Sequence, residues 1–178
     1  LQISFFGGKN PFSYWHADSI EMNSRVEKEL SDYSKLIKGI PEKYHLSSPF
    51  QKSLPEQRGH YFKSEIINSD ILRYQNFVTN AYLTNNMKAI KDSIVVEIGS
   101  GYGGLAFQLL RKLEVRKRIL VDLPQTLCIA GSYLTVLGKD IKVSTISNSY
   151  DLKNALENNH EVILLPSYLF LNDAKIID

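Results

Sequence analysis

The pattern of apolar and polar positions divides the chain into a helical first part and a second part in which strands and helices alternate. In residues 18–38, apolar side chains recur three or four positions apart, which predicts a helix with one buried face. Gly39 and Pro41 end this helix. The same spacing predicts a second helix over residues 68–90. Residues 41–60 between them are rich in proline and predict a loop.

From residue 93 the pattern changes to short apolar runs separated by helical periods. The runs lie at 94–97, 118–121, 141–146 and 161–165, and helical spacing follows at 105–113, 124–137 and 150–158. The first run does not alternate, as expected of a parallel strand covered on both faces. Right-handed crossovers then predict an α/β domain over 93–178, with helices on both faces and strand order 3-2-1-4. A helical region, 1–92, precedes it.

The first strand of this domain leads into a glycine-rich turn. Glycines at 99, 101, 103 and 104 allow a sharp bend and let a ligand approach without meeting a Cβ. The helix that follows presents unpaired N–H groups and a positive dipole end. The spacing also satisfies G-x-G-x-x-G, which is typical of a dinucleotide site. Glu97 argues against a pyrophosphate there, because two like charges would face each other. A tight turn without a ligand is the remaining alternative.

Polar or turn residues follow the other strands. Asp122 lies 25 residues after Glu97, where a nucleotide-binding α/β unit places the acid that binds ribose hydroxyls. Its alternative role is a helix cap, since Pro124 favours a first helical turn. Ser147 follows the third strand, near an expected adenine position, and Pro166 follows the fourth. We expect these groups to gather at the carboxyl edge, with the switch point between strands one and four.

Composition narrows the function. The chain has 178 residues, of which 43% are hydrophobic and 22% charged, as in ordinary globular proteins. No apolar run approaches the roughly 20 residues of a membrane helix, and no signal peptide is evident. A single cysteine fits a reducing cytoplasm. The net charge of +2 gives no case for nucleic acid, and the basic residues at 111–118 are explained by solvation at a helix end.

Two features of the first part are candidates for a role near a substrate. Residues 1–17 are rich in aromatic side chains and predict a docking segment, or alternatively a substrate cover. His60 beside Tyr61 is a candidate general base. The alternative is an exposed histidine without a catalytic role.

The segments EIGSGYGGLAFQLL and ILVDLPQTLCIAGSYL, within residues 94–137, resemble class I S-adenosylmethionine-dependent methyltransferases. More narrowly, they are similar to a family of sugar O-methyltransferases. The resemblance implies that Asp122 holds the ribose, Leu123 packs by the adenine and Pro166 borders the methyl donor. It further implies that the methionine part is held by the acid and the turn: Glu97, Gly99, Ser100, Gly101, Tyr102 and Gly103.

The resemblance implies methyl transfer from S-adenosylmethionine to a sugar hydroxyl by in-line displacement, which requires alignment of the two reactants and a base for the hydroxyl proton. No spacing of His, Asp or Glu suggests a metal site. Class I methyltransferases have seven strands, so we expect the last three to belong to residues outside this sequence. The fourth strand would then be an open edge, available for self-association. The alternatives are an NAD(P)-dependent oxidoreductase and a non-catalytic, cofactor-binding remnant.

Overall fold

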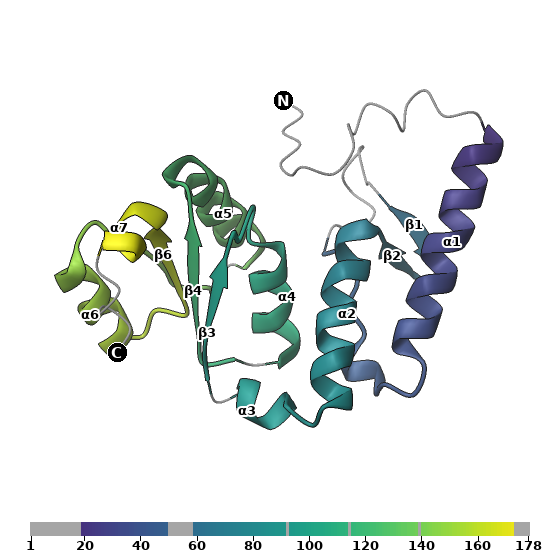
Figure 1. Cartoon of the computed structure of the whole chain (residues 1–178), viewed down its shortest axis with the longest axis horizontal. Helices are drawn as coiled ribbons and strands as arrows, with labels where there is room; N and C mark the ends of the chain where they lie inside the picture. The colour runs from purple at the N-terminus through teal and green to yellow at the C-terminus, as the bar shows by residue number, and fades with distance from the viewer. Residues whose placement is uncertain (1–18, 50–58, 92, 114, 139, 173–178) are drawn as a thin grey trace. The chain divides into compact units, whose positions relative to one another are not determined.

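The computed structural model describes residues 19–49, 59–91, 93–113, 115–138 and 140–172, which form two compact units, 1–86 and 87–178 (Figure 1). The aromatic segment 1–17 lies outside the described residues. The domain boundary predicted between residues 92 and 93 falls after helix α3 (Met87–Lys91), which belongs to the second unit. No helix in the described ranges is long and apolar enough to cross a membrane.

The first unit packs two helices against a hairpin. It comprises α1 (Ser19–Ile37), the short 3-10 helix η2 (Glu42–Tyr44), β1 (His60–Phe62), β2 (Glu65–Ile67) and α2 (Ser69–Leu83). Polar contacts fix the segment between the helices: the Tyr33 hydroxyl donates to the Leu46 carbonyl at 2.7 Å, and the Leu46 N–H donates to Gln75 Oε1 at 2.8 Å. Helix α1 confirms the helix predicted over residues 18–38. The hairpin was not predicted, because three-residue strands leave almost no periodicity to detect.

The single helix predicted over 68–90 is wrong, since α2 ends at Leu83 and α3 begins at Met87. Asn85 takes a left-handed conformation, with φ of 57°. The Asn86 N–H donates to the Ala81 carbonyl and the Asn85 N–H to the Tyr82 carbonyl, at 2.9 and 3.0 Å. These bonds form a Schellman motif, in which asparagine replaces the usual glycine. The predicted start of the helix is confirmed, because Asn68 Oδ1 accepts from the Ile71 N–H.

The second unit has the predicted succession of four parallel strands and intervening helices. After α3 come β3 (Ile94–Ile98), α4 (Gly104–Leu113), β4 (Lys117–Asp122), α5 (Pro124–Leu137), β5 (Val143–Thr145), α6 (Ser149–Glu157), β6 (Val162–Pro166) and α7 (Ser167–Asn172). Helix α5 has the predicted bounds because Pro124 favours its first turn and Gly138 follows its last.

The predicted strand order is wrong. The sheet has the order β3-β4-β6-β5, so the fourth strand lies between the second and third, and the first strand is at an edge. All five residues of β6 are buried, which requires cover on both faces and pairing on both sides. Strand β3 carries Glu97 and has exposed ends, which an edge position tolerates. The expected open edge on the fourth strand is therefore absent, and the edges of this sheet are β3 and β5.

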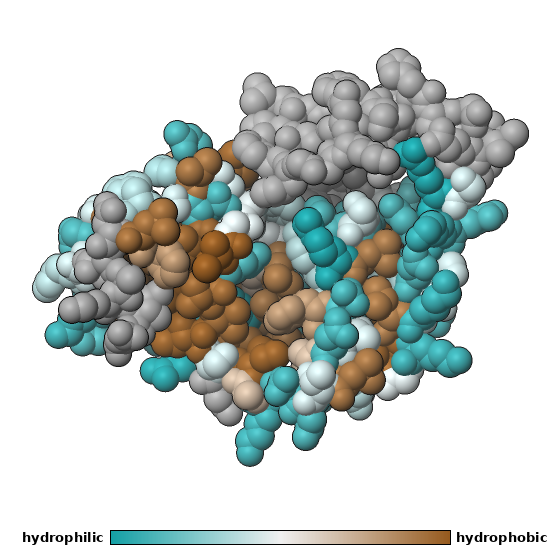
Figure 2. All heavy atoms as spheres, viewed as in Figure 1, coloured by the Kyte–Doolittle hydropathy of each residue, from teal (hydrophilic) through white to brown (hydrophobic). Residues whose placement is uncertain are grey.

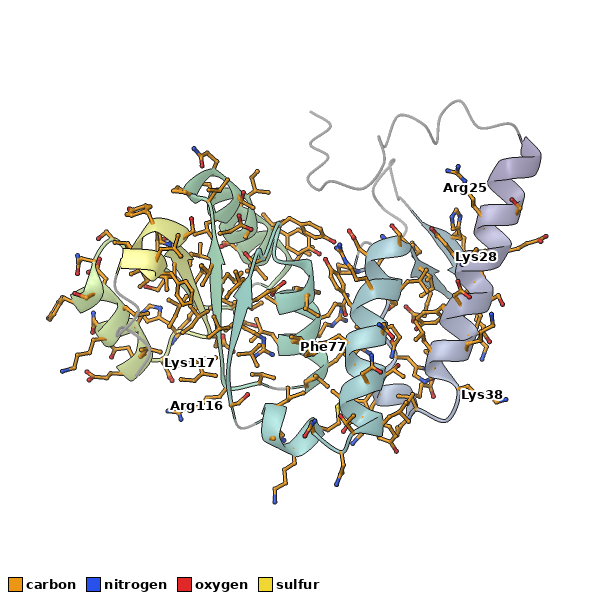
Figure 3. All side chains as sticks on the ribbon, in the orientation of Figure 1. Arg25, Lys28, Lys38, Phe77, Arg116 and Lys117 are labelled. Carbon is orange, nitrogen blue, oxygen red and sulfur yellow. The ribbon has the colours of Figure 1, made fainter. Side chains whose placement is uncertain are left out.

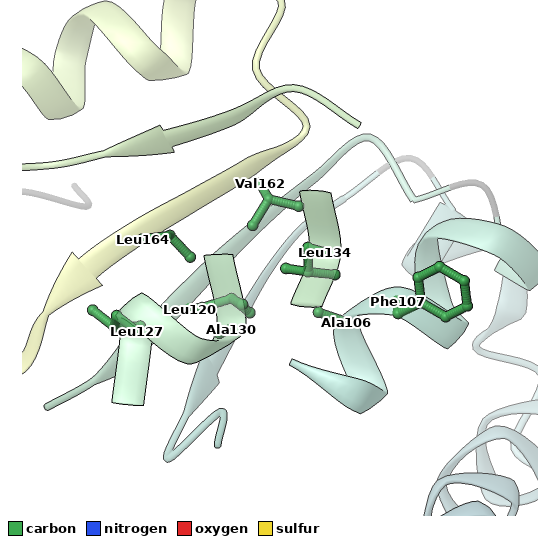
Figure 4. Packing of buried hydrophobic residues seen from close by; sticks show 8 residues of the cluster. All are labelled: Ala106, Phe107, Leu120, Leu127, Ala130, Leu134, Val162 and Leu164. Carbon is green, nitrogen blue, oxygen red and sulfur yellow. The ribbon is translucent and has the colours of Figure 1, made fainter. Parts of the chain in front are cut away.

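Each face of the sheet carries its own hydrophobic cluster. Figure 4 shows the cluster beneath α4 and α5, whose members are Ala106, Phe107, Leu120, Leu127, Ala130, Leu134, Val162 and Leu164. The opposite cluster lies beneath α6 and α7 and includes Ile119, Val121, Ile163 and Leu165. As the chain moves from β3 through β4 to β5, its helices lie on one face. As it returns to β6, α6 lies on the other face, as right-handed crossovers require.

The apolar cover is incomplete along β3. On the α6 side of this strand, Ile94 is 41% exposed and Ile98 is 71% exposed. Figure 2 shows hydrophobic side chains at the surface in this part of the second unit. Strand β3 is thus apolar on a face that the described helices leave partly open.

Candidate functional site

The turn after β3 is built from glycines in left-handed conformations. Gly99, Gly101 and Gly103 have φ values of 74°, 58° and 82°, which side-chain-bearing residues rarely adopt. The Gly99 N–H donates to the Val121 carbonyl at 2.8 Å, and the Gly103 N–H donates to the Ser100 carbonyl at 3.1 Å. Helix α4 then begins at Gly104. The turn is therefore tied to the end of β4 and closed upon itself.

Asp122 joins the ends of β3 and β4. Its Oδ2 accepts from the Gly101 N–H at 2.8 Å, and its Oδ1 accepts from the Leu123 N–H at 2.7 Å. The N-cap residue of α5 is Leu123, whose side chain makes no cap bond. A carboxylate has about four acceptor positions, so each oxygen can still accept from a ligand hydroxyl. The arrangement is compatible with the expected role of Asp122 toward a ribose. Asp122 as the cap of α5 is wrong, because Leu123 holds the N-cap position and the Asp122 carboxylate accepts from Gly101 and Leu123.

The glycines of the turn have different structural roles. A Cβ at Gly99 would meet nothing within 4 Å, so open space lies above this residue. A Cβ at Gly103 would lie 3.3 Å from Leu134 Cδ1, so Gly103 allows α5 to pack closely. Tyr102 also lies against α5, because its ring meets the Tyr133 ring edge-on at 4.9 Å. The open side of the turn is therefore at Gly99.

Apolar and polar groups border this open side. Ile98 is 71% exposed and Leu123 is 59% exposed, so two aliphatic side chains flank the ends of β3 and β4. Ser100 is buried, and its Oγ has no hydrogen-bond partner among the described residues. Glu97, also on β3, is partly buried. The strand ends next to the turn thus carry a carboxylate, a hydroxyl and apolar side chains, with Glu97 and Ile98 on opposite faces of the sheet.

The strand order brings Pro166 to this site and leaves Ser147 away from it. Pro166 pairs in register with Asp122 and is buried. Helices α5 and α7 leave the neighbouring ends of β4 and β6 toward opposite faces, so the switch point lies between these two strands, not between strands one and four. Ser147 follows β5, beyond β6, and donates through both its N–H and its hydroxyl to Asp151 Oδ2. Ser147 therefore helps to begin α6.

The candidate base residues belong to the first unit. His60 Nε2 lies 3.5 Å from Glu29 Oε2, and Tyr61 is 57% exposed. Burial raises the pKa of Glu29 from its usual value, and the nearby His60 opposes this rise. His60 thus pairs with an acid on α1.

Two cations that the sequence pattern placed in solvent are buried. Lys117 and Arg118, expected in a solvated cluster, are 5% and 0% exposed at the start of β4. The Lys117 ammonium donates to three carbonyls at and just beyond the end of α6, those of Ala155 and His160 at 3.0 Å and that of Asn158. Figure 3 labels Lys117 and its neighbour Arg116. The sequence feature that could have predicted their burial is their position immediately before an apolar run.

The described side chains include no group of three or more His, Cys, Asp or Glu residues that could hold a metal ion. Comparison of the chain with family models, curated proteins and solved structures gives no match.

Proposed function

We propose that the chain binds S-adenosylmethionine at the carboxyl ends of β3 and β4 and takes part in methyl transfer to a carbohydrate hydroxyl. The observation that carries this proposal is the 2.8 Å hydrogen bond from the Gly101 N–H to Asp122 Oδ2. It joins a glycine turn and an acid into one unit that has acceptor oxygens to spare. Such a unit suits a ligand with a vicinal diol and positively charged groups.

The same contacts disfavour a dinucleotide, the alternative from a different enzyme class. A pyrophosphate needs backbone N–H groups in this turn. The N–H groups of Gly99, Gly101 and Gly103 already donate to Val121, Asp122 and Ser100, respectively. The Asp122 carboxylate would also repel a phosphate brought to Gly101. A ligand bearing a sulfonium and an ammonium group meets no such repulsion.

Each residue of the site would contact a different part of the ligand. In this proposal Asp122 accepts from the ribose hydroxyls, Leu123 contacts the adenine, and Glu97 lies by the methionine ammonium. S-adenosylmethionine, when bound, supplies an electrophilic methyl carbon. The protein would hold the acceptor hydroxyl in line with this carbon and remove its proton. His60 and Tyr61 stay the candidates for proton removal.

The remaining expectations belong to the same proposal. We place the protein in the cytoplasm. A non-catalytic protein that binds the same cofactor is the second candidate, because the features above concern binding and not turnover.

Calorimetric titration with S-adenosylhomocysteine, with NAD as the comparison ligand, tests the proposal. We expect binding of the former and weakening in Asp122→Asn, which keeps the side-chain shape but loses the charge. A hydrogen bond to a charged group contributes about 1.5–3 kcal/mol, so Kd should rise about tenfold to hundredfold. Asp140→Asn is the matched control, because Asp140 is exposed and precedes β5. Binding of NAD alone would refute the proposal, and methylation of sugar acceptors would separate an enzyme from a binding protein.

A further inference from the structure

Arg118 and Glu97 lie on the same face of the sheet. Val95 pairs with Arg118, and Glu97 pairs with Leu120, in the parallel register of β3 and β4. Residues two apart on a strand share a face, and Leu120 belongs to the cluster beneath α4 and α5. Both charged residues are therefore on that face. Strand spacing and rise place their Cα atoms about 8 Å apart, within reach of two long side chains.

The Arg118 side chain is buried with few hydrogen bonds. The residue is 0% exposed, and its Nη1 donates to the Lys117 carbonyl at 3.1 Å. Its Nε and Nη2 have no hydrogen-bond partner among the described residues. Burial lowers the pKa of Arg118 to about 9, and the charge of Glu97 opposes this effect. A buried guanidinium is costly unless an opposite charge accompanies it, and Glu97 supplies that charge.

Glu97 also precedes the open glycine turn, two residues before Gly99. We propose that Arg118 is a positioning residue, whose buried charge on the same face of the sheet attracts the Glu97 carboxylate and so orients it at the ligand end of β3. The ligand group that this carboxylate receives is an ammonium, so the inference rests on the proposed function. Arginine suits the position because it stays charged when buried. The amino-acid part of the ligand would thus be recognised through a charge pair that begins in the interior.

The coupling can be measured first without any ligand. Thermal unfolding midpoints would be compared for the wild type, Arg118→Met, Glu97→Gln and the double variant. We expect each single change to lower the midpoint, since it leaves one charge without the other. The double variant should recover much of the loss, because both charges leave together. Additive losses would overturn the inference. Arg118→Gln, which also removes the charge but keeps polar atoms, replaces Arg118→Met if the latter does not fold.

Ligand selectivity provides the second test. S-adenosylhomocysteine carries the amino-acid group, and adenosine lacks it. We expect Arg118→Met to weaken binding of the former at least tenfold and to change adenosine binding less than twofold. The matched control is Arg116→Met, which alters an exposed neighbouring cation and should change neither. Equal weakening of both ligands would show a merely structural role and overturn the inference while the proposed function stands. If the wild type binds neither ligand, the proposed function fails and the ammonium role of Glu97 fails with it, whatever the unfolding cycle shows.

Discussion

At the scale of single residues, two glycines provide a matched test of the open side of the turn. Gly99 and Gly39 have φ values of 74° and 78°, and a Cβ at either would meet nothing within 4 Å. Alanine should therefore cost about 1–2 kcal/mol of backbone strain at both positions, without a clash. We expect only Gly99→Ala to weaken S-adenosylhomocysteine binding, because its methyl group would occupy the ligand space. Urea unfolding and calorimetry measure the two effects. Unchanged affinity in Gly99→Ala would mean that the ligand does not lie over this residue.

The partly buried carboxyl of Glu29 predicts a pH dependence of stability in the first unit. Burial raises the pKa of Glu29 above its usual 4.5, so the folded state holds this proton more tightly than the unfolded state. Its contribution to stability is therefore lost as the pH rises from about 4.5 through the folded-state pKa. Glu29→Gln cannot lose this proton. We therefore expect the urea midpoint of the variant to increase relative to that of the wild type as the pH rises from acidic to neutral. Glu27→Gln, an exposed change on the same helix, is the control. Parallel pH profiles for Glu29→Gln and the wild type would contradict the assignment.

Sequence spacing predicted where some candidate site residues lie in the fold and failed for others for a physical reason. Asp122 could be placed because a strand end and a following proline mark its position along the chain. Lys117 and Arg118 were expected in solvent, because a basic run after a helix normally interacts with its terminus and with water. The acceptors of Lys117 lie 38 to 43 residues further along the chain. Local sequence carries no information about partners that only the fold brings together.

At the scale of elements, α6 is held at its end by a single lysine. The Lys117 ammonium uses its three donors on the carbonyls of Ala155, Asn158 and His160, at and just beyond the end of α6, where the last helical carbonyls have no partner within the helix. We expect Lys117→Met to lower the free energy of unfolding by about 2–3 kcal/mol, since hydrogen bonds from a charged group are lost and burial of the charge returns part of the loss. Arg116→Met, at the exposed neighbouring position, should stay within about 0.5 kcal/mol of the wild type. Equal effects in urea unfolding would contradict this role.

The predictability of an element followed the strength of its boundary signals. Helix α5 was predicted to the residue because proline and glycine mark both ends. The break between α2 and α3 was missed, because asparagine at a helix end is a weaker signal than glycine and the apolar spacing continues past it. The α2–α3 turn became visible only through the two backbone bonds that close it.

At the scale of the whole molecule, the order of the strands was not accessible from local pattern. Both the expected and the observed orders satisfy right-handed crossovers and cover both faces. What separates them is which strand needs a neighbour on each side. Strand β6 is buried throughout and takes an interior place, whereas β3 is exposed at both ends and lies at the edge. The site was affected accordingly: Asp122 came beside Pro166, and Ser147 was left two strands away.

The strand order also moves the predicted point of self-association from β6 to β3. An edge strand offers unpaired backbone groups, and β3 adds apolar side chains at both ends, with Ile94 41% exposed. A lysine at an edge opposes strand pairing, so we expect Ile94→Lys to weaken concentration-dependent association roughly tenfold. Val136→Lys is the control. Val136 lies on α5, away from the edge, and is 77% exposed, so its replacement removes an apolar side chain that is more exposed than Ile94. Sedimentation velocity over a range of concentrations separates the two causes. If Val136→Lys weakens association as much as Ile94→Lys, general surface hydrophobicity drives it; if only Ile94→Lys does, the partner chain pairs along β3.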